Sequence, residues 1–241
     1  MAASDALCSI LFEDQHLIVV DKPPGMLSQG GDADVGGCNN IVDWLRRRLG
    51  RPYVGLVHRL DRNTSGVMVV AKRTKAARRL TEALGEGRLR RIYIAIVCGH
   101  IPGPCTWRHF LEKDASTNKV RICKSGEMKA GAKEAVLRVA PLKYSSTQSL
   151  ATLAEFELET GRSHQIRAQA AHERHPVVGD RKYGCHTGVK TESYGIQRPA
   201  LHSLRILFPH PMSGEVMRFE AGIPADIEKV SRILFDARCV I

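Results

Sequence analysis

The chain has 241 residues, 43% of them hydrophobic, so it can bury a substantial core as one large domain or two small ones and is neither disordered nor fibrous. Its 36 Lys and Arg residues outnumber its 25 Asp and Glu residues, which gives a formal net charge of +11. A charge of this size favours a polyanionic partner such as nucleic acid, and a generic basic surface is the alternative interpretation.

The seven cysteines are odd in number and never form a C-x-x-C pair, a pattern that argues against a structural zinc site and favours reduced thiols. No apolar run approaches the roughly 18 residues needed to cross a bilayer. The first residues carry acids that a transit peptide would avoid. We therefore expect a cytoplasmic protein that does not span a membrane.

Elements in the N-terminal part begin with two short apolar strands over residues 9–14 and 16–22, followed by a turn at Pro23-Pro24-Gly25. A Gly- and Asp-rich stretch over 29–40 predicts a surface loop before a helix over 41–50.

A buried strand is expected from Val67 to Ala71, followed by a helix capped by Thr74. In that helix Ala77, Leu80 and Leu84 share one face, and Gly85 or Gly87 ends it.

In the second half, residues 91–97 alternate three isoleucines with other residues, so that Tyr93 lies on the opposite sheet face. Residues 154–159 alternate apolar residues with glutamates, as a half-buried strand does. Residues 163–175 predict a helix that stops before Pro176, and residues 200–208 and 216–223 predict two more strands.

The expected helix over 163–175 carries His164, Arg167 and Ala171 along one stripe. Across the chain, strands outnumber helices and follow one another directly, which favours an α+β fold with a largely antiparallel sheet over a doubly wound parallel sheet. No repeat or linker divides the sequence, so we expect a single domain over 1–241.

The densest polar cluster, His58 to Gly66, stands immediately before the buried strand. It is either a functional site or a turn in which Asp61 or Asn63 bonds its own backbone. Flanking Arg59 and Arg62, with Arg167 from elsewhere, would favour an ionised Asp61 suited to act as nucleophile or base. Taken alone, Arg167 is more often an ordinary surface or ion-pair residue.

Two other patterns could indicate a metal site or a nucleotide site, and the sequence favours neither. His172 and His175 stand at a permissible ligand spacing, with Cys185-His186 downstream, but no second close pair or acidic cluster accompanies them, so a metal site is disfavoured. The glycines between Gly30 and Gly37 match neither the P-loop nor the dinucleotide fingerprint.

Two long segments resemble the RluA-type pseudouridine synthases, which isomerise uridine in RNA. HRLDRNTSGVMVVAK (58–72) is similar to that family's hallmark segment, and ETGRSHQIRAQAAHERHPVVGDRKYG (159–184) to its second long motif. Shorter matches occur in the family's order and span nearly the whole chain: VVDKPPGMLSQ (19–29), RRIYIAIVCGH (90–100), RPALHSLRILFPHP (198–211) and EAGIP (220–224).

The resemblance implies an α+β pseudouridine synthase catalytic domain with a mixed, mainly antiparallel sheet, flanking helices and a central active-site cleft. It implies that Asp61 is the essential catalytic residue, that Tyr93 stacks on the target base and that Arg167 pairs with Asp61. It also implies that Arg59 fills the space left by a flipped nucleotide. The other polar residues of the two motifs are expected to bind substrate, namely His58, Arg62, Thr64, His164 and Gln165.

The expected partner is RNA, either tRNA or rRNA, bound by a monomer that needs no cofactor, metal or obligatory protein partner. Many family members carry an extra N-terminal RNA-binding domain, and no such domain is evident here. A non-catalytic RNA-binding or ribosome-assembly factor on the same scaffold is the alternative, although the presence of Asp61 disfavours it. A metal-dependent nuclease would need clustered acids and histidines that the sequence lacks.

Overall fold

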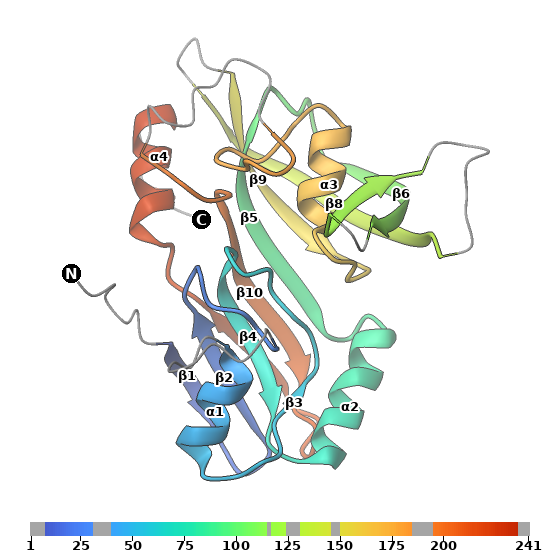
Figure 1. The fold of residues 1–241 in the computed structure, drawn as a ribbon, viewed down its shortest axis with the longest axis vertical. Coiled ribbons are helices and arrows are strands. Elements are labelled where there is room, and N and C mark those ends of the chain that lie inside the picture. The colour runs from blue at the N-terminus through green and yellow to red at the C-terminus, as the bar shows by residue number, and fades with distance from the viewer. Residues whose placement is uncertain are drawn as a thin grey trace. The chain divides into compact units, whose positions relative to one another are not determined.

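The computed structural model describes residues 8–30, 40–114, 117–123, 131–145, 150–184 and 195–235 (Figure 1). They fall into two compact units. The first unit comprises Met1–Arg91 and Ser203–Gly222, and the second comprises Ile92–His202 and Ile223–Ile241. The chain passes between the units inside two strands, β5 (Arg90–Cys98) and β10 (Leu201–Pro209), and again after Gly222. The single catalytic domain over 1–241 stays a prediction, as does its central cleft.

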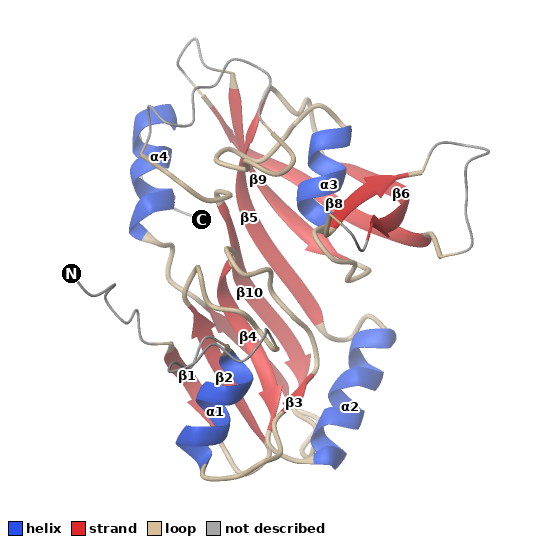
Figure 2. Cartoon of the chain, viewed as in Figure 1, coloured by secondary structure: helices blue, strands red, loops and turns tan. Residues whose placement is uncertain are grey.

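In the first unit, β1 pairs with β2 and β2 with β4, both antiparallel, while β3 pairs with β4 and β11 with β10 in the same sense. Strand β10 lies next to β4. Two helices accompany these strands (Figure 2). The bounds are β1 (Ser9–Glu13), β2 (Leu17–Lys22), α1 (Ile41–Leu49), β3 (Gly55–Leu56), β4 (Ser65–Ala71), α2 (Thr74–Gly85) and β11 (Val216–Glu220).

The core of the first unit forms because β4 is buried along its whole length and α2 turns an apolar stripe toward the strands. Leu80 of α2 packs with Val67 and Val69 of β4 and with Phe208 of β10, and all four side chains are fully buried. Burial of each such side chain contributes about 1.5–3 kcal/mol. The loop that leads into β4 therefore ends on a rigidly packed strand.

In the second unit, β5 pairs with β9, β9 with β8, β8 with β6 and β6 with β7, all antiparallel. Helix α3 packs through Ala168 on Leu111, Val120 and Ala135 of three of these strands. The bounds are β6 (Cys105–Asp114), β7 (Lys119–Ile122), β8 (Lys133–Tyr144), β9 (Ala151–Leu158), α3 (Gln165–His172) and α4 (Ala225–Phe235). The α+β class with a mixed, mainly antiparallel sheet and flanking helices is confirmed.

Most of the expected elements are present, with three differences. Thr74 is the first residue of α2 and not its cap, because Arg73 occupies the cap position without a side-chain hydrogen bond. His164 precedes α3 with a positive φ of 51° and so does not lie on the helical stripe. The sequence did not predict β3, α4 or the strands between Cys105 and Tyr144.

Within the described ranges, no helix is long and apolar enough to cross a membrane. Cys8, Cys105 and Cys123 carry free thiols, whereas Cys98 is disulfide-bonded, so the expectation of reduced thiols fails at that position. Cys185-His186 and the glycines from Gly31 to Gly37 lie outside the described residues.

Candidate active site

The loop that carries Asp61 is fixed at the residues on both sides of it. On one side, Leu60 is held by Ser28, whose Oγ accepts from the Leu60 N–H at 3.0 Å and donates to the Leu60 carbonyl at 2.8 Å. On the other side, the Arg62 carbonyl accepts from the Gly25 N–H at 2.8 Å and from Lys22 Nζ at 3.1 Å. The half-buried Asp61 therefore sits on a backbone clamped one residue before and one residue after it.

Lys22 is the deepest charge in the first unit, with its side chain fully buried at the end of β2. Besides Arg62, its ammonium donates to the carbonyls of Pro23 at 2.9 Å and Met26 at 2.8 Å. A buried ammonium is costly unless its donors are satisfied, so these carbonyls fix its position. The lysine ties the turn after β2 to the Asp61 loop, which lies forty residues farther along the chain.

Arg59 and Arg62 differ in how they are held. Arg59 is exposed, and its role in filling the space left by a flipped nucleotide stays a prediction. Arg62 is also exposed, but its Nε donates to the Gly25 carbonyl at 2.9 Å. The guanidinium of Arg62 is thus bound to the turn after β2. The substrate-binding role of Arg62 stays a prediction.

His58 is a buried neutral histidine. Its Nε2 accepts from the Val69 N–H at 3.1 Å, so Nδ1 carries the proton. Burial, together with the positive charge of Arg91, lowers the pKa of His58 to about 3. Its hydrogen bond joins the start of the loop to β4, an arrangement typical of a structural residue.

The loop ends in a tight junction with β10 inside the first unit. Thr64 is buried, and its N–H closes a turn onto the Asp61 carbonyl at 3.0 Å. Gly66 follows with a φ of 115°, and a Cβ there would lie 2.1 Å from the Ser203 carbonyl oxygen. Only glycine permits this approach, which fixes where the loop joins β4.

The second unit holds the other candidate residues, and among them Arg167 has the most defined geometry. Its Nε and Nη2 donate to the two carboxylate oxygens of Asp180 at 2.6 and 2.8 Å. The Asp180 side chain is fully buried and also accepts from the N–H groups of Lys182 and Tyr183 at 3.0 and 3.2 Å. The guanidinium lies 5.1 Å from the centroid of the Tyr183 ring. Carboxylate and ring together define the plane of Arg167.

The hydroxyl of Tyr183 also fixes His164. It accepts from the Val120 N–H at 2.9 Å and lies 2.8 Å from Nδ1 of His164. Tyr183 thereby connects His164 to β7, and the substrate-binding role of His164 stays a prediction.

Gln165 and Tyr93 are both buried, at 3% and 4% exposure. The Gln165 amide oxygen accepts from Thr160 and from the Arg162 N–H, and its nitrogen donates to the Val136 carbonyl. It connects the loop before α3 to β8. Tyr93 lies in β5 opposite Phe156 of β9. The substrate-binding role of Gln165 and the stacking role of Tyr93 stay predictions.

The structure thus groups the candidate residues in two sets. His58, Arg59, Asp61, Arg62 and Thr64 share one loop of the first unit, and Tyr93, His164, Gln165 and Arg167 lie in the second unit on β5 and at α3. The contact between Arg167 and Asp61 stays a prediction.

Four contributors were missed by sequence reasoning: Lys22, Ser28, Asp180 and Tyr183. All four lie inside segments that carry the family resemblance. A lysine at the end of a mostly apolar strand was the available signal for Lys22, and the Asp-x-x-Tyr spacing after Gly179 was the signal for Asp180 and Tyr183. Ser28 had no such signal.

Metal ligation finds no support in the described part of the chain, where no group of three or more His, Cys, Asp or Glu side chains could hold an ion. His175 Nδ1 lies 3.0 Å from the Cys98 carbonyl, and His172 meets His109 edge to face. The two histidines that prompted the metal hypothesis therefore have other neighbours.

The chain is similar to known proteins in sequence and in fold. Residues 16–172 match the family model described as RNA pseudouridylate synthase. The chain is 37% identical over 234 residues to "Ribosomal large subunit pseudouridine synthase D" of Neisseria meningitidis serogroup B, covering 93% of this chain and 60% of that protein. It is 34% identical to "Ribosomal large subunit pseudouridine synthase C" of Escherichia coli O6:H1, covering 95% of this chain and 70% of that one.

The solved structure "Human RNA Pseudouridylate Synthase Domain Containing 4" matches with a TM-score of 0.73 at 24% identity, over 93% of this chain and 92% of that chain, which shows a shared fold. The chain spans 60% of the length of the Neisseria relative. The family match covers more than half of the chain, and the Escherichia coli relative is covered over more than two thirds of its length. The chain therefore belongs to the RNA pseudouridylate synthase family.

Proposed function

We propose that the protein isomerises uridine to pseudouridine within RNA and that Asp61 is the catalytic carboxylate. The observation that carries this proposal is the clamp on Leu60 and Arg62, which holds Asp61 on a fixed backbone. A reacting group held in place needs little reorganisation when the substrate arrives. A loop that served only as a surface turn would not need buried side chains on both sides.

The reaction breaks the bond between the ribose C1′ and N1 of uracil, turns the base, and joins C1′ to C5. The proton leaves C5 and N1 gains one, so atoms and electrons balance without an oxidant or reductant. One ionised carboxylate can act as nucleophile at the sugar or the base, or remove a ribose proton. All three routes require the carboxylate of Asp61 to be ionised.

The remaining candidates would act around that step, either on the RNA or on Asp61. Base extrusion costs a few kcal/mol, and the exposed Arg59 can offset part of this cost by filling the gap. Tyr93 would support the base, and Arg167 would orient the carboxylate. The net charge of +11 favours phosphate binding. Two relatives are named for the ribosomal large subunit, so its RNA is the first substrate to test and tRNA the second.

The test is pseudouridine mapping on unmodified large-subunit rRNA and tRNA transcripts with wild type, Asp61→Asn and Asn63→Ala. Asp61→Asn should bind RNA and melt like wild type but form product at less than about a hundredth of the wild-type rate, because groups with such roles usually contribute at least that factor. Asn63→Ala, in the same loop, should keep most of the rate. RNA binding by wild type without any product would favour the non-catalytic alternative.

A further inference from the structure

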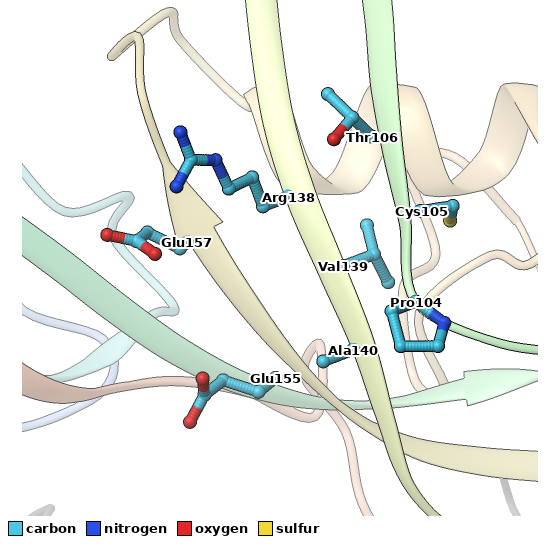
Figure 3. A pocket seen from close by; sticks show the side chains of 8 residues that line it. All are labelled: Pro104, Cys105, Thr106, Arg138, Val139, Ala140, Glu155 and Glu157. Atoms are coloured by element: carbon cyan, nitrogen blue, oxygen red, sulfur yellow. The ribbon is translucent and has the colours of Figure 1, made fainter.

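Among the described residues of the second unit, two of the surface cavities differ in charge character. One, of about 370 Å³, lies over β6, β8 and β9 (Figure 3). Two carboxylates line it, Glu155 and Glu157, together with one cation, Arg138, which pairs with Glu159 at 2.6 Å. This cavity does not suit a polyanion.

The other cavity, of about 430 Å³, has a basic rim. Three cations line it, Lys113, Lys133 and Arg162. Its one carboxylate, Glu112, is already held by Arg121, whose Nε lies 2.8 Å away. The lining therefore presents an excess of positive charge to whatever enters the cavity.

The three cations come from different parts of the fold that the second unit brings together. Lys113 is near the end of β6, Lys133 begins β8, and Arg162 lies in the loop before α3. Nε of Arg162 donates to the Glu134 carbonyl at 2.9 Å, which holds its guanidinium at the cavity edge. Both lysines are exposed. Within the described ranges neither lysine forms an ion pair.

Apolar residues and a glycine and a serine from the loop before α3 also line the cavity. The apolar residues are the buried Leu111 and Val120, and the other two are Gly161 and Ser163. The glycine leaves the backbone open to approach, and the serine offers a hydroxyl donor. A basic rim, a hydroxyl and an open backbone are the groups that bind a phosphate.

We propose that this cavity is a phosphodiester subsite that holds the backbone of the RNA substrate beside α3. It rests on the proposed function for the identity of its ligand. Arg162 and Ser163 belong to the segment that continues directly into His164 and Arg167. A phosphate held there fixes the strand relative to α3 and supplies affinity independent of base sequence.

The test compares Lys113→Ala/Lys133→Ala with a control of equal charge loss, Lys75→Ala/Lys229→Ala, whose lysines are also exposed. Binding of a fluorescein-labelled oligouridylate is measured over a range of salt concentrations. The cavity variant should bind about tenfold more weakly, and its salt dependence should fall by about 0.7 for each phosphate of a single strand that the variant no longer neutralises. The control should stay near wild type.

Phosphate-ethylation interference supplies a local readout. Wild type and control should show a phosphate whose ethylation blocks binding, and the cavity variant should lose that interference. Equal salt dependence in both double variants, with the interference pattern unchanged, would overturn the subsite. Pseudouridine mapping of the same proteins keeps the two proposals distinct, because wild type without product contradicts the activity and leaves the subsite result standing.

Discussion

Arg167 and Asp180 form a two-point ion pair, with Nε and Nη2 of the arginine 2.6 and 2.8 Å from the two oxygens of a fully buried carboxylate. The pair joins α3 to the turn after Val178, which Gly179 enters with a φ of 79°. A Cβ at Gly179 would lie 2.1 Å from the Arg198 carbonyl oxygen, so only glycine can occupy this position of the turn. The orientation of Arg167 is therefore set from within the second unit.

Asp180→Asn is the first prediction drawn from this pair. The amide keeps the shape but loses the charge and one acceptor, so Arg167 is left partly uncompensated in a buried site. We expect a lower melting temperature and a turnover reduced at least about tenfold, measured by thermal unfolding and single-turnover kinetics.

A control pair exists in the same unit. Arg198 and Asp226 also form a two-point pair, at 2.7 and 2.8 Å, with the arginine buried and the carboxylate side chain 37% exposed. Asp226→Asn should lower the melting temperature and leave turnover close to wild type. Equal loss of turnover in both variants would reduce Asp180 to a purely structural residue.

Ser28→Ala tests the clamp before Asp61. The substitution leaves the Leu60 N–H and carbonyl without their side-chain partner in a buried position, which costs about 1–3 kcal/mol. Because the freed backbone adjoins Asp61, we expect kcat to fall while RNA affinity is retained. Thr152→Ala is the comparison, since its buried hydroxyl donates to the Gly99 carbonyl at 2.7 Å and accepts from the Ile101 N–H at 3.2 Å, in the second unit. It should lose stability alone.

His58 predicts a pH dependence of stability. Its pKa is about 3 in the folded protein and near the ordinary value of 6.5 when unfolded. Between pH 6.5 and 3, His58 binds a proton in the unfolded chain but stays neutral in the folded chain. The free energy of unfolding therefore falls as pH drops toward 3. The slope contributed by one such group approaches about 1.4 kcal/mol per pH unit.

The measurement is denaturant unfolding between about pH 7 and about pH 5 for wild type and His58→Gln. Glutamine at 58 offers an oxygen to the Val69 N–H and does not titrate, so the stability of this variant should depend less steeply on pH. Parallel curves for wild type and His58→Gln would show that His58 protonates freely in the folded protein.

The sequence predicted the fold where the apolar period was regular. Strands β4 and β9 and helix α1 were identified because their buried residues recur at the strand or helix spacing. Strand β6 was missed because only Trp107 and Leu111 of its ten residues are buried. Helix α4 carries Ile227, Val230 and Leu234 at helical spacing, a signal that was present and not used.

In the candidate site, the sequence pointed clearly to the residues that are expected to contact the substrate. It pointed less clearly to the residues that hold them in place. The cluster around Asp61 is contiguous and stands out as a motif. Its supports are distant in sequence, since Ser28 lies 32 residues from Leu60 and Lys22 lies 40 from Arg62. The partner of Arg167 is 13 residues away, across a turn that only the folded chain defines. Pairings of this kind follow from tertiary packing and carry no local pattern.

Arg59→Ala separates a role in base extrusion from a role in phosphate binding. Arg59 is exposed, and the backbone of the next residue, Leu60, is hydrogen-bonded to Ser28. The backbone at Arg59 is therefore held in place, while its side chain extends into solvent. If the guanidinium occupies the gap left by the target uridine, the variant should lose rate on a stacked substrate and recover part of it when the uridine is already unpaired and unstacked. Single-turnover kinetics on a stacked and a loosened version of one RNA make the comparison, with Arg78→Ala, an exposed arginine of α2, as control. Equal loss on both RNAs, accompanied by a shallower salt dependence of binding, would make Arg59 a phosphate contact and remove it from base extrusion.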